Sequence, residues 1–176
     1  MIIVITHSEN DNHIYAHDTL EFVAVAAQYC AVLEQEKMPS RQEFIDMMLK
    51  LLPLLYTKVT LLAHVEPDAG MAPNDQVTDR DYAYVQGNVM DVLGEMDSYE
   101  ALGNDPTGQT DEVVWHSCSE DLADIYQPLR NFVHAYQLRL EPMMEAELWN
   151  VRENFEMYWG MNLINALSHL HRLRYD

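Results

Sequence analysis

The last third of the chain constrains the fold most strongly. From Pro142 to Leu173, apolar residues recur every three or four positions, the spacing of one face of an α-helix. Trp149, Ile164 and Leu167 widen this face, which is typical of a helix with neighbours on two sides. Pro142 also suits the first position of a helix. We therefore predict a long C-terminal helix in the centre of a helical bundle.

Four earlier segments show the same spacing: residues 18–36, 40–62, 78–96 and 117–140. Ser40 and Glu43 form the S-x-x-E pattern of a helix start. Pro53 and Pro128 fall inside two of the segments, where a proline kinks or breaks a helix. The fold class that follows is all-α, a single-domain bundle of about five helices.

The sequence contains no convincing set of alternating apolar and polar residues that would predict strands. Two short segments are the exceptions, residues 1–5 (MIIVI) and 112–115 (EVVW), and either is expected to be an extended arm. We place the domain boundaries at 1–17 for an N-terminal arm and at 18–176 for one helical domain. An apolar arm tends to dock on its own core or on another chain, and with the many aromatic residues it suggests a homodimer.

Charge excludes several classes of partner. The net charge is −19, from 29 acidic and 10 basic residues. Such a chain repels nucleic acids and anionic membranes, because those contacts need clusters of Lys and Arg. Residues 66–124 contain 15 acidic residues and one basic residue, Arg80. This belt is either a solvated surface or a docking face for a basic partner, or it binds divalent cations loosely.

The cysteine pattern and the N-terminus suggest a cytoplasmic protein. Cys30 and Cys118 form no CxxC pair, so we expect two reduced thiols. The start of the sequence lacks the basic segment of a signal peptide. The longest apolar run, which contains Pro53 and Lys58, is too interrupted for a membrane span.

Several stretches of the chain resemble the bacterial domain-of-unknown-function family 5063. They are LEFVAVAAQYCAVLE (20–34), MLKLLPLLYTKVTLL (48–62), EDLADIYQPL (120–129) and LWNVRENFEMYWGMNLINALSHLH (148–171). The resemblance implies a compact, single-domain helical protein from a bacterium and carries no activity. The family often has His two residues after the Trp-Gly pair, where this chain has Asn162.

Three carboxylates crowd the start of the fourth predicted helix. Ser117 and Glu120 have the spacing of a capping box, and Asp121 falls in the first turn, where the helix dipole favours an anion. On a helical projection Asp124 lies far from the apolar stripe, so we predict that it faces outward. Only Asp121 remains a candidate for an interior polar site.

Other charges border the predicted core. Lys58 projects near the apolar stripe of its helix, and Arg152 and Glu156 are spaced i, i+4 beside Trp159. Buried charges need partners. With Asp121, these residues are expected either to close into a structural ion cluster or to line a pocket for a small polar ligand. We favour the closed cluster.

Metal and catalytic motifs are sparse. His13, His17 and Glu21 share one helical face and make a candidate transition-metal site, although such residues are usually solvated. The sequence has no HExxH, GxSxG, Walker A or GxGxxG motif. We assign no catalytic residue and expect no cofactor.

Two hypotheses for function remain. The first is a non-enzymatic interaction or regulatory module that presents its acidic surface to an unknown, basic protein partner. The alternative is a small-molecule or metal-binding protein, enzymatic or not, that uses the polar residues between the second, fourth and fifth helices.

Overall fold

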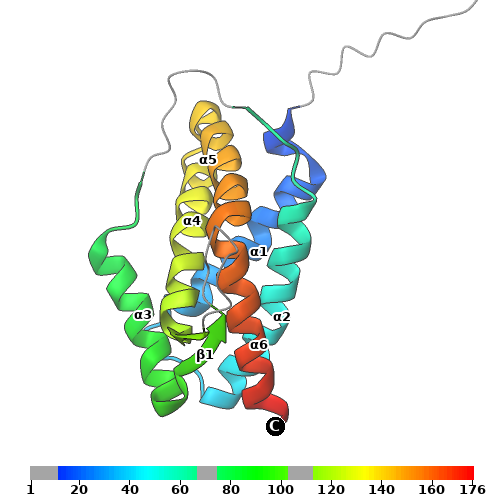
Figure 1. Cartoon of the computed structure of the whole chain (residues 1–176). Helices are drawn as coiled ribbons and strands as arrows, with labels where there is room; N and C mark the ends of the chain where they lie inside the picture. The colour runs from blue at the N-terminus through cyan, green and yellow to red at the C-terminus, as the bar shows by residue number, and fades with distance from the viewer. Residues whose placement is uncertain (1–11, 67–74, 103–112) are drawn as a thin grey trace, which may run out of the picture.

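The computed structural model describes residues 12–66, 75–102 and 113–176. Helices make up most of this part of the protein (Figure 1). The α-helices are α1 (His17–Leu33), α2 (Arg41–Thr60), α3 (Asp79–Leu93), α4 (Cys118–Leu138), α5 (Glu141–Asn154) and α6 (Gly160–Tyr175). Shorter elements are the 3₁₀ turns η1 (His13–Tyr15) and η2 (Gly94–Met96), the π-helical turn η3 (Phe155–Trp159), and the strands β1 (Ser98–Leu102) and β2 (Val113–Ser117). The predicted all-α, single-domain bundle is confirmed.

Local capping sets two of the helix starts. The Ser40 hydroxyl accepts from the Glu43 backbone amide, and the Glu43 carboxylate accepts from the Ser40 amide at 3.0 Å. Thr78 and Asp81 repeat this arrangement before α3. Both starts agree with the sequence, because a capping box depends only on residues three positions apart.

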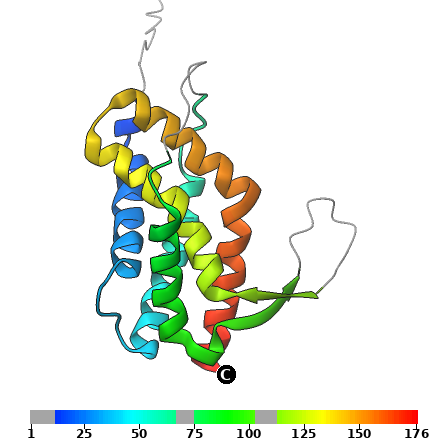
Figure 2. The same cartoon turned by 90° about the vertical axis from the view of Figure 1, so that its left-hand side faces the viewer.

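The centre of the bundle is shared by α4 and the C-terminal helix. α4 packs against α1, α3, α5 and α6, while α6 packs against α2 and α4 (Figures 1 and 2). The rings of Phe22 and Phe132 pack between α1 and α4 with their centroids 5.2 Å apart and their planes tilted by 45°. The buried Tyr29 hydroxyl donates to the carbonyl of Leu122 at 2.7 Å, so its polar atom is satisfied inside this core.

Helices continue through both internal prolines. Pro53 lies within α2 and Pro128 within α4, so the break that the sequence allowed does not occur. The predicted C-terminal helix is likewise continuous through α5, η3 and α6, but with the π-helical turn inserted at 155–159. A π-turn shifts the helical register locally, so side chains before and after it point in different directions. The five predicted helices therefore correspond to five helical rods.

The segment between α3 and α4 differs from the prediction. β1 and β2 pair antiparallel, with Tyr99 opposite His116 and Glu100 opposite Trp115. Residues 112–115 were expected to form a short extended piece without a partner strand. Figure 2 shows this hairpin projecting sideways from the end of the bundle.

The N-terminal boundary also differs. Residues 1–11, including the MIIVI segment, lie outside the described residues. The described fold includes η1, and Ile14 is 1% exposed in the core. The Tyr136 hydroxyl donates to the Ile14 carbonyl at 2.8 Å. Ile14, within the segment predicted as an arm, is thus packed on the bundle, while residues 15–17 are exposed.

The structure bears on two predictions, the state of the cysteines and the presence of a membrane-spanning helix. Cys30 and Cys118 are both buried free thiols. Burial raises the pKa of each thiol, which keeps them protonated. Across the described residues, no helix is both long and apolar enough to cross a bilayer.

Candidate functional site

Asp121 is the predicted candidate that lies inside the fold. It sits in the first turn of α4 and is 4% exposed. The Tyr99 hydroxyl donates to its Oδ2 atom, and His116 Nδ1 lies 3.7 Å from its Oδ1 atom. The register of the hairpin explains this grouping, because β1 places Tyr99 opposite His116 and β2 runs directly into α4.

His169 of α6 completes what we call the hairpin cluster: Tyr99, His116, Asp121 and His169. The Tyr99 ring stacks on the His169 ring with centroids 4.3 Å apart and planes 10° apart. Its centroid lies 5.6 Å from that of His116. His169 Nε2 is 2.7 Å from the carbonyl oxygen of Met96. The cluster therefore joins the hairpin to both α4 and α6.

Burial sets the protonation of the hairpin cluster. It raises the pKa of Asp121 to about 6, against the opposing effects of the Tyr99 hydrogen bond and His116. Burial also raises the pKa of Tyr99, and the Asp121 carboxylate raises it further. The pKa of His169 is lowered by burial, which favours the neutral imidazole.

Contacts within the hairpin cluster connect the hairpin to the bundle. Tyr99 contacts Asp121, His116 and His169, and none of the four residues lines the cavity between α3 and α4, while the buried Nε2 atom of His116 has no hydrogen-bond partner among the described residues. The arrangement fits a polar latch that holds the hairpin against the bundle.

Asp97 reinforces this latch at the start of α4. Its carboxylate is 6% exposed and accepts three bonds of 2.7 Å, from the Ser119 amide, the Ser119 hydroxyl and the Ser117 hydroxyl. Ser117 caps the Glu120 amide at 3.5 Å, as the sequence predicts. The carboxylate that supports this cap is Asp97, whereas the spacing indicated Glu120.

Asp124 corrects a prediction. It was expected to face outward, but it is half-buried between helices. The Tyr82 hydroxyl of α3 donates to Asp124 Oδ1 at 2.8 Å, and the Asn162 amide of α6 donates to Oδ2 at 3.0 Å. A projection with one apolar stripe failed here because α4 has neighbours on several sides.

Lys58 has a partner other than Asp121. Its Nζ atom lies 2.5 Å from Glu21 Oε2 of α1, and this bond lowers the pKa of the Glu21 carboxyl. The bond links α1 to the C-terminal half of α2. Figure 1 shows that this part of α2 and the start of α4 lie at different levels of the bundle.

Arg152, Glu156 and Trp159 form a third, separate group. Arg152 Nε lies 3.3 Å from Glu156 Oε1, and the same guanidinium donates to the Leu62 carbonyl past the end of α2. Trp159 is 1% exposed, and its Nε1 donates to the Val151 carbonyl at 3.0 Å. Trp159 is thus packed in the core. The five predicted residues occupy three separate places in the bundle.

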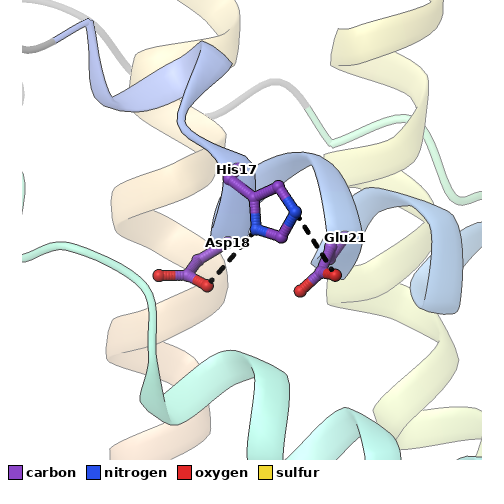
Figure 3. Close-up of side chains that lie close together, drawn as sticks. All are labelled: His17, Asp18 and Glu21. Atoms are coloured by element: carbon purple, nitrogen blue, oxygen red, sulfur yellow. Dashed lines mark ion pairs between the residues drawn. The ribbon is translucent and has the colours of Figure 1, made fainter.

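The candidate metal site changes in composition. His17, Asp18 and Glu21 cluster at the start of α1 (Figure 3), with His17 Nε2 3.6 Å from Glu21 Oε1 and His17 Nδ1 4.0 Å from Asp18 Oδ1. His13 is outside this group, and its carbonyl accepts from Thr19. The Lys58 ammonium already occupies the other oxygen of Glu21 and competes with a cation. The three residues make an exposed ion-pair group.

Tyr99, His116 and His169 were not predicted as site residues from the sequence. Tyr99 falls between the third and fourth predicted helices, in a stretch for which no helix or strand was predicted. The available signal was the pair of short runs SYEAL and VVWHS, which read as two strands once paired.

Fold and site together define a single-domain α-helical bundle with one projecting β-hairpin. The chain belongs to the family described as "Domain of unknown function (DUF5063)", whose sequence model matches residues 13–176. The resemblance found in the sequence is thereby confirmed. The crystal structure of protein BF1032 from Bacteroides fragilis is similar, with 35% sequence identity and a TM-score of 0.80 over 93% of this chain and 99% of that chain. No curated protein matches the chain.

Proposed function

We propose that this protein is a cytoplasmic, non-enzymatic interaction module whose projecting hairpin docks on a basic protein partner. The observation that carries the proposal is the exposure of Trp115. This side chain is 73% exposed on β2, although tryptophan is normally among the more buried residue types.

The outer face of the hairpin has the composition of a contact site. Val113 is 58% exposed and lies two residues from Trp115, so both side chains point to the same face of β2. Exposed tryptophans often supply a large share of the binding energy at protein interfaces. Together the two side chains offer an apolar anchor on a part of the molecule that neighbouring chains can reach.

Charge favours a basic partner over a second copy. Glu100 is exposed and pairs across the hairpin with Trp115. The whole chain has a net charge of −19, so two copies repel each other. A partner rich in Lys and Arg is attracted by the same field, and an Arg side chain can stack on the Trp115 ring.

The interior supports the non-enzymatic part of the proposal. Asp121, Asp124, Lys58 and Arg152 each bond to other groups of the protein. A reactive site needs such groups to face a substrate. Their present bonds instead connect helices and hold the hairpin.

The test is affinity capture from native lysate with three baits: wild type, Trp115→Ala and Tyr175→Ala. Tyr175 is 65% exposed at the end of α6, outside the two strands of the hairpin, and serves as the matched control. We expect a defined protein that wild type and Tyr175→Ala retain at low salt, and that Trp115→Ala or raised salt releases. Retention of the same proteins by Trp115→Ala, or of none by wild type, would refute the proposal.

A further inference from the structure

A cavity of about 390 Å³ lies between α3 and α4, next to the C-terminal end of α1. Its size falls in the range of pockets that hold small metabolites. It belongs neither to the hairpin cluster nor to the Trp115 face. The side chains used below are Glu34, Asp81, Tyr84, Tyr126, Arg130 and His134.

Helical spacing builds one wall of the cavity. Tyr126, Arg130 and His134 are four residues apart on α4 and form one stripe. Beside this stripe, the Asn131 side-chain oxygen accepts from the backbone amides of Gln76 and Val77, at 2.9 and 3.1 Å. The chain that enters α3 is therefore held in place, and the cavity is formed before any ligand arrives.

The cavity wall has an excess of negative charge. Arg130 Nε lies 2.9 Å from Glu34 Oε1, so this guanidinium is already paired. The Tyr126 hydroxyl donates to the same oxygen at 2.8 Å. Asp81 forms no ion pair with a described residue. Its bonds from Thr78 lower its pKa and keep it ionised, and the charges of Arg80 and Arg130 lower the pKa by a smaller amount.

Acceptor atoms remain on both carboxylates. Among the bonds between described residues, those of Glu34 fall on Oε1 and those of Asp81 on Oδ2. Glu34 Oε2 and Asp81 Oδ1 are left to accept from a ligand. A ligand that satisfies them must carry N–H or O–H donors, and an anion would be repelled.

Two aromatic rings supply apolar surface beside these oxygens. Tyr84 is 46% exposed at the rim, and Tyr126 is 3% exposed in the wall. Tyrosine faces attract cations and also pack against short hydrocarbon chains. The net charge of −19 raises the local concentration of cations further.

We propose that this cavity binds a small organic cation, an ammonium or guanidinium group on a short hydrocarbon stem. Glu34 and Asp81 accept its N–H bonds, and the tyrosine rings contact its stem. The cation is either a free amine or the side chain of a Lys or Arg residue from another protein.

Three four-carbon probes of similar shape test the chemistry: putrescine, 1,4-butanediol and succinate, titrated by calorimetry at neutral pH. We expect binding of putrescine and no binding of the diol or the dianion. A capped Ala-Lys-Ala peptide distinguishes the sources, since its binding in the absence of putrescine binding assigns the site to protein side chains. Binding of succinate, or of neither cationic probe, overturns the proposal.

Matched variants distinguish binding in the cavity from general attraction of a cation to the acidic surface. Asp81→Asn should weaken binding of the cation about fivefold, because a charge-assisted hydrogen bond is lost. Asp91→Asn removes the same charge from an exposed position on α3 and should leave binding unchanged. Glu34→Gln and the exposed Glu36→Gln form a second pair with the same expectation. Equal weakening by all four variants would show attraction to the surface alone and would refute the site.

Discussion

Asp121→Asn gives the sharpest test of the buried hairpin cluster. Asparagine is nearly isosteric, and its side-chain oxygen still accepts from Tyr99. The substitution therefore removes mainly the ionisation of a group that is 4% exposed. Its effect on the free energy of unfolding should depend on pH, because the wild-type carboxyl titrates differently in the folded and unfolded chains.

The sign and the size of this pH-dependent effect on the free energy of unfolding follow from the pKa of Asp121. Burial raises the pKa of Asp121 from 3.8 to about 6 in the folded protein. Well below pH 3.8 the carboxyl is protonated in both states and contributes no penalty. Between pH 4 and pH 6 the unfolded chain ionises first, so wild-type stability falls as pH rises. The difference of about two pKa units between the folded and unfolded chains corresponds to ~3 kcal/mol of the free energy of unfolding.

Urea denaturation of wild type and Asp121→Asn at several pH values between 4 and 7 measures this effect. The variant should gain stability relative to wild type by about 3 kcal/mol across that range. Asp91→Asn, at an exposed position, should show no such trend. A difference that stays flat, or that falls with pH, would mean that Tyr99 and His116 outweigh burial, and the electrostatic argument would fail.

Further predictions concern packing and capping. Gly160→Ala should destabilise the protein by about 1–3 kcal/mol, because the new Cβ would lie 2.6 Å from the Phe155 carbonyl oxygen in the π-turn. Gly87→Ala, with nothing within 4 Å, should instead stabilise α3 by up to ~1 kcal/mol, and thermal melts compare the two. Asp97→Ala should cost about 2–3 kcal/mol and increase amide exchange in the hairpin, because three buried donors lose their acceptor. Trp159→Ala should cost about 3–5 kcal/mol in denaturant titrations without changing binding of putrescine, as expected of a core residue outside the cavity.

Local sequence predicted the helices well, because helix formation depends on neighbours within four residues. The capping pair of Ser40 and Glu43 was predicted for that reason, whereas near Thr78 only the start of the helix was predicted. The hairpin was missed because pairing of β1 with β2 depends on contacts across an intervening segment. The π-turn at Phe155–Trp159 also has no clear local signal, since its residues suit an ordinary helix.

The candidate site was harder to predict than the fold. Asp121 was kept as a candidate for an interior polar site with Lys58 or Arg152 as its partner. Its partners are instead Tyr99 and His116 of the hairpin, which only the topology brings together. Long side chains added a second difficulty. Lys58 projects near the core stripe of α2, and its flexible stem reaches Glu21 on a neighbouring helix that a projection of α2 alone does not include.

Site-specific crosslinking tests the proposed docking surface most directly. A photoreactive phenylalanine derivative replaces Trp115 in one strain and Tyr175 in another, both exposed positions, and the cells are irradiated before lysis. We predict a covalent adduct with a basic protein at position 115 and none at position 175. Adducts only with a second copy of the chain, equal adducts at both positions, or no adduct at 115 would contradict a basic partner at the hairpin.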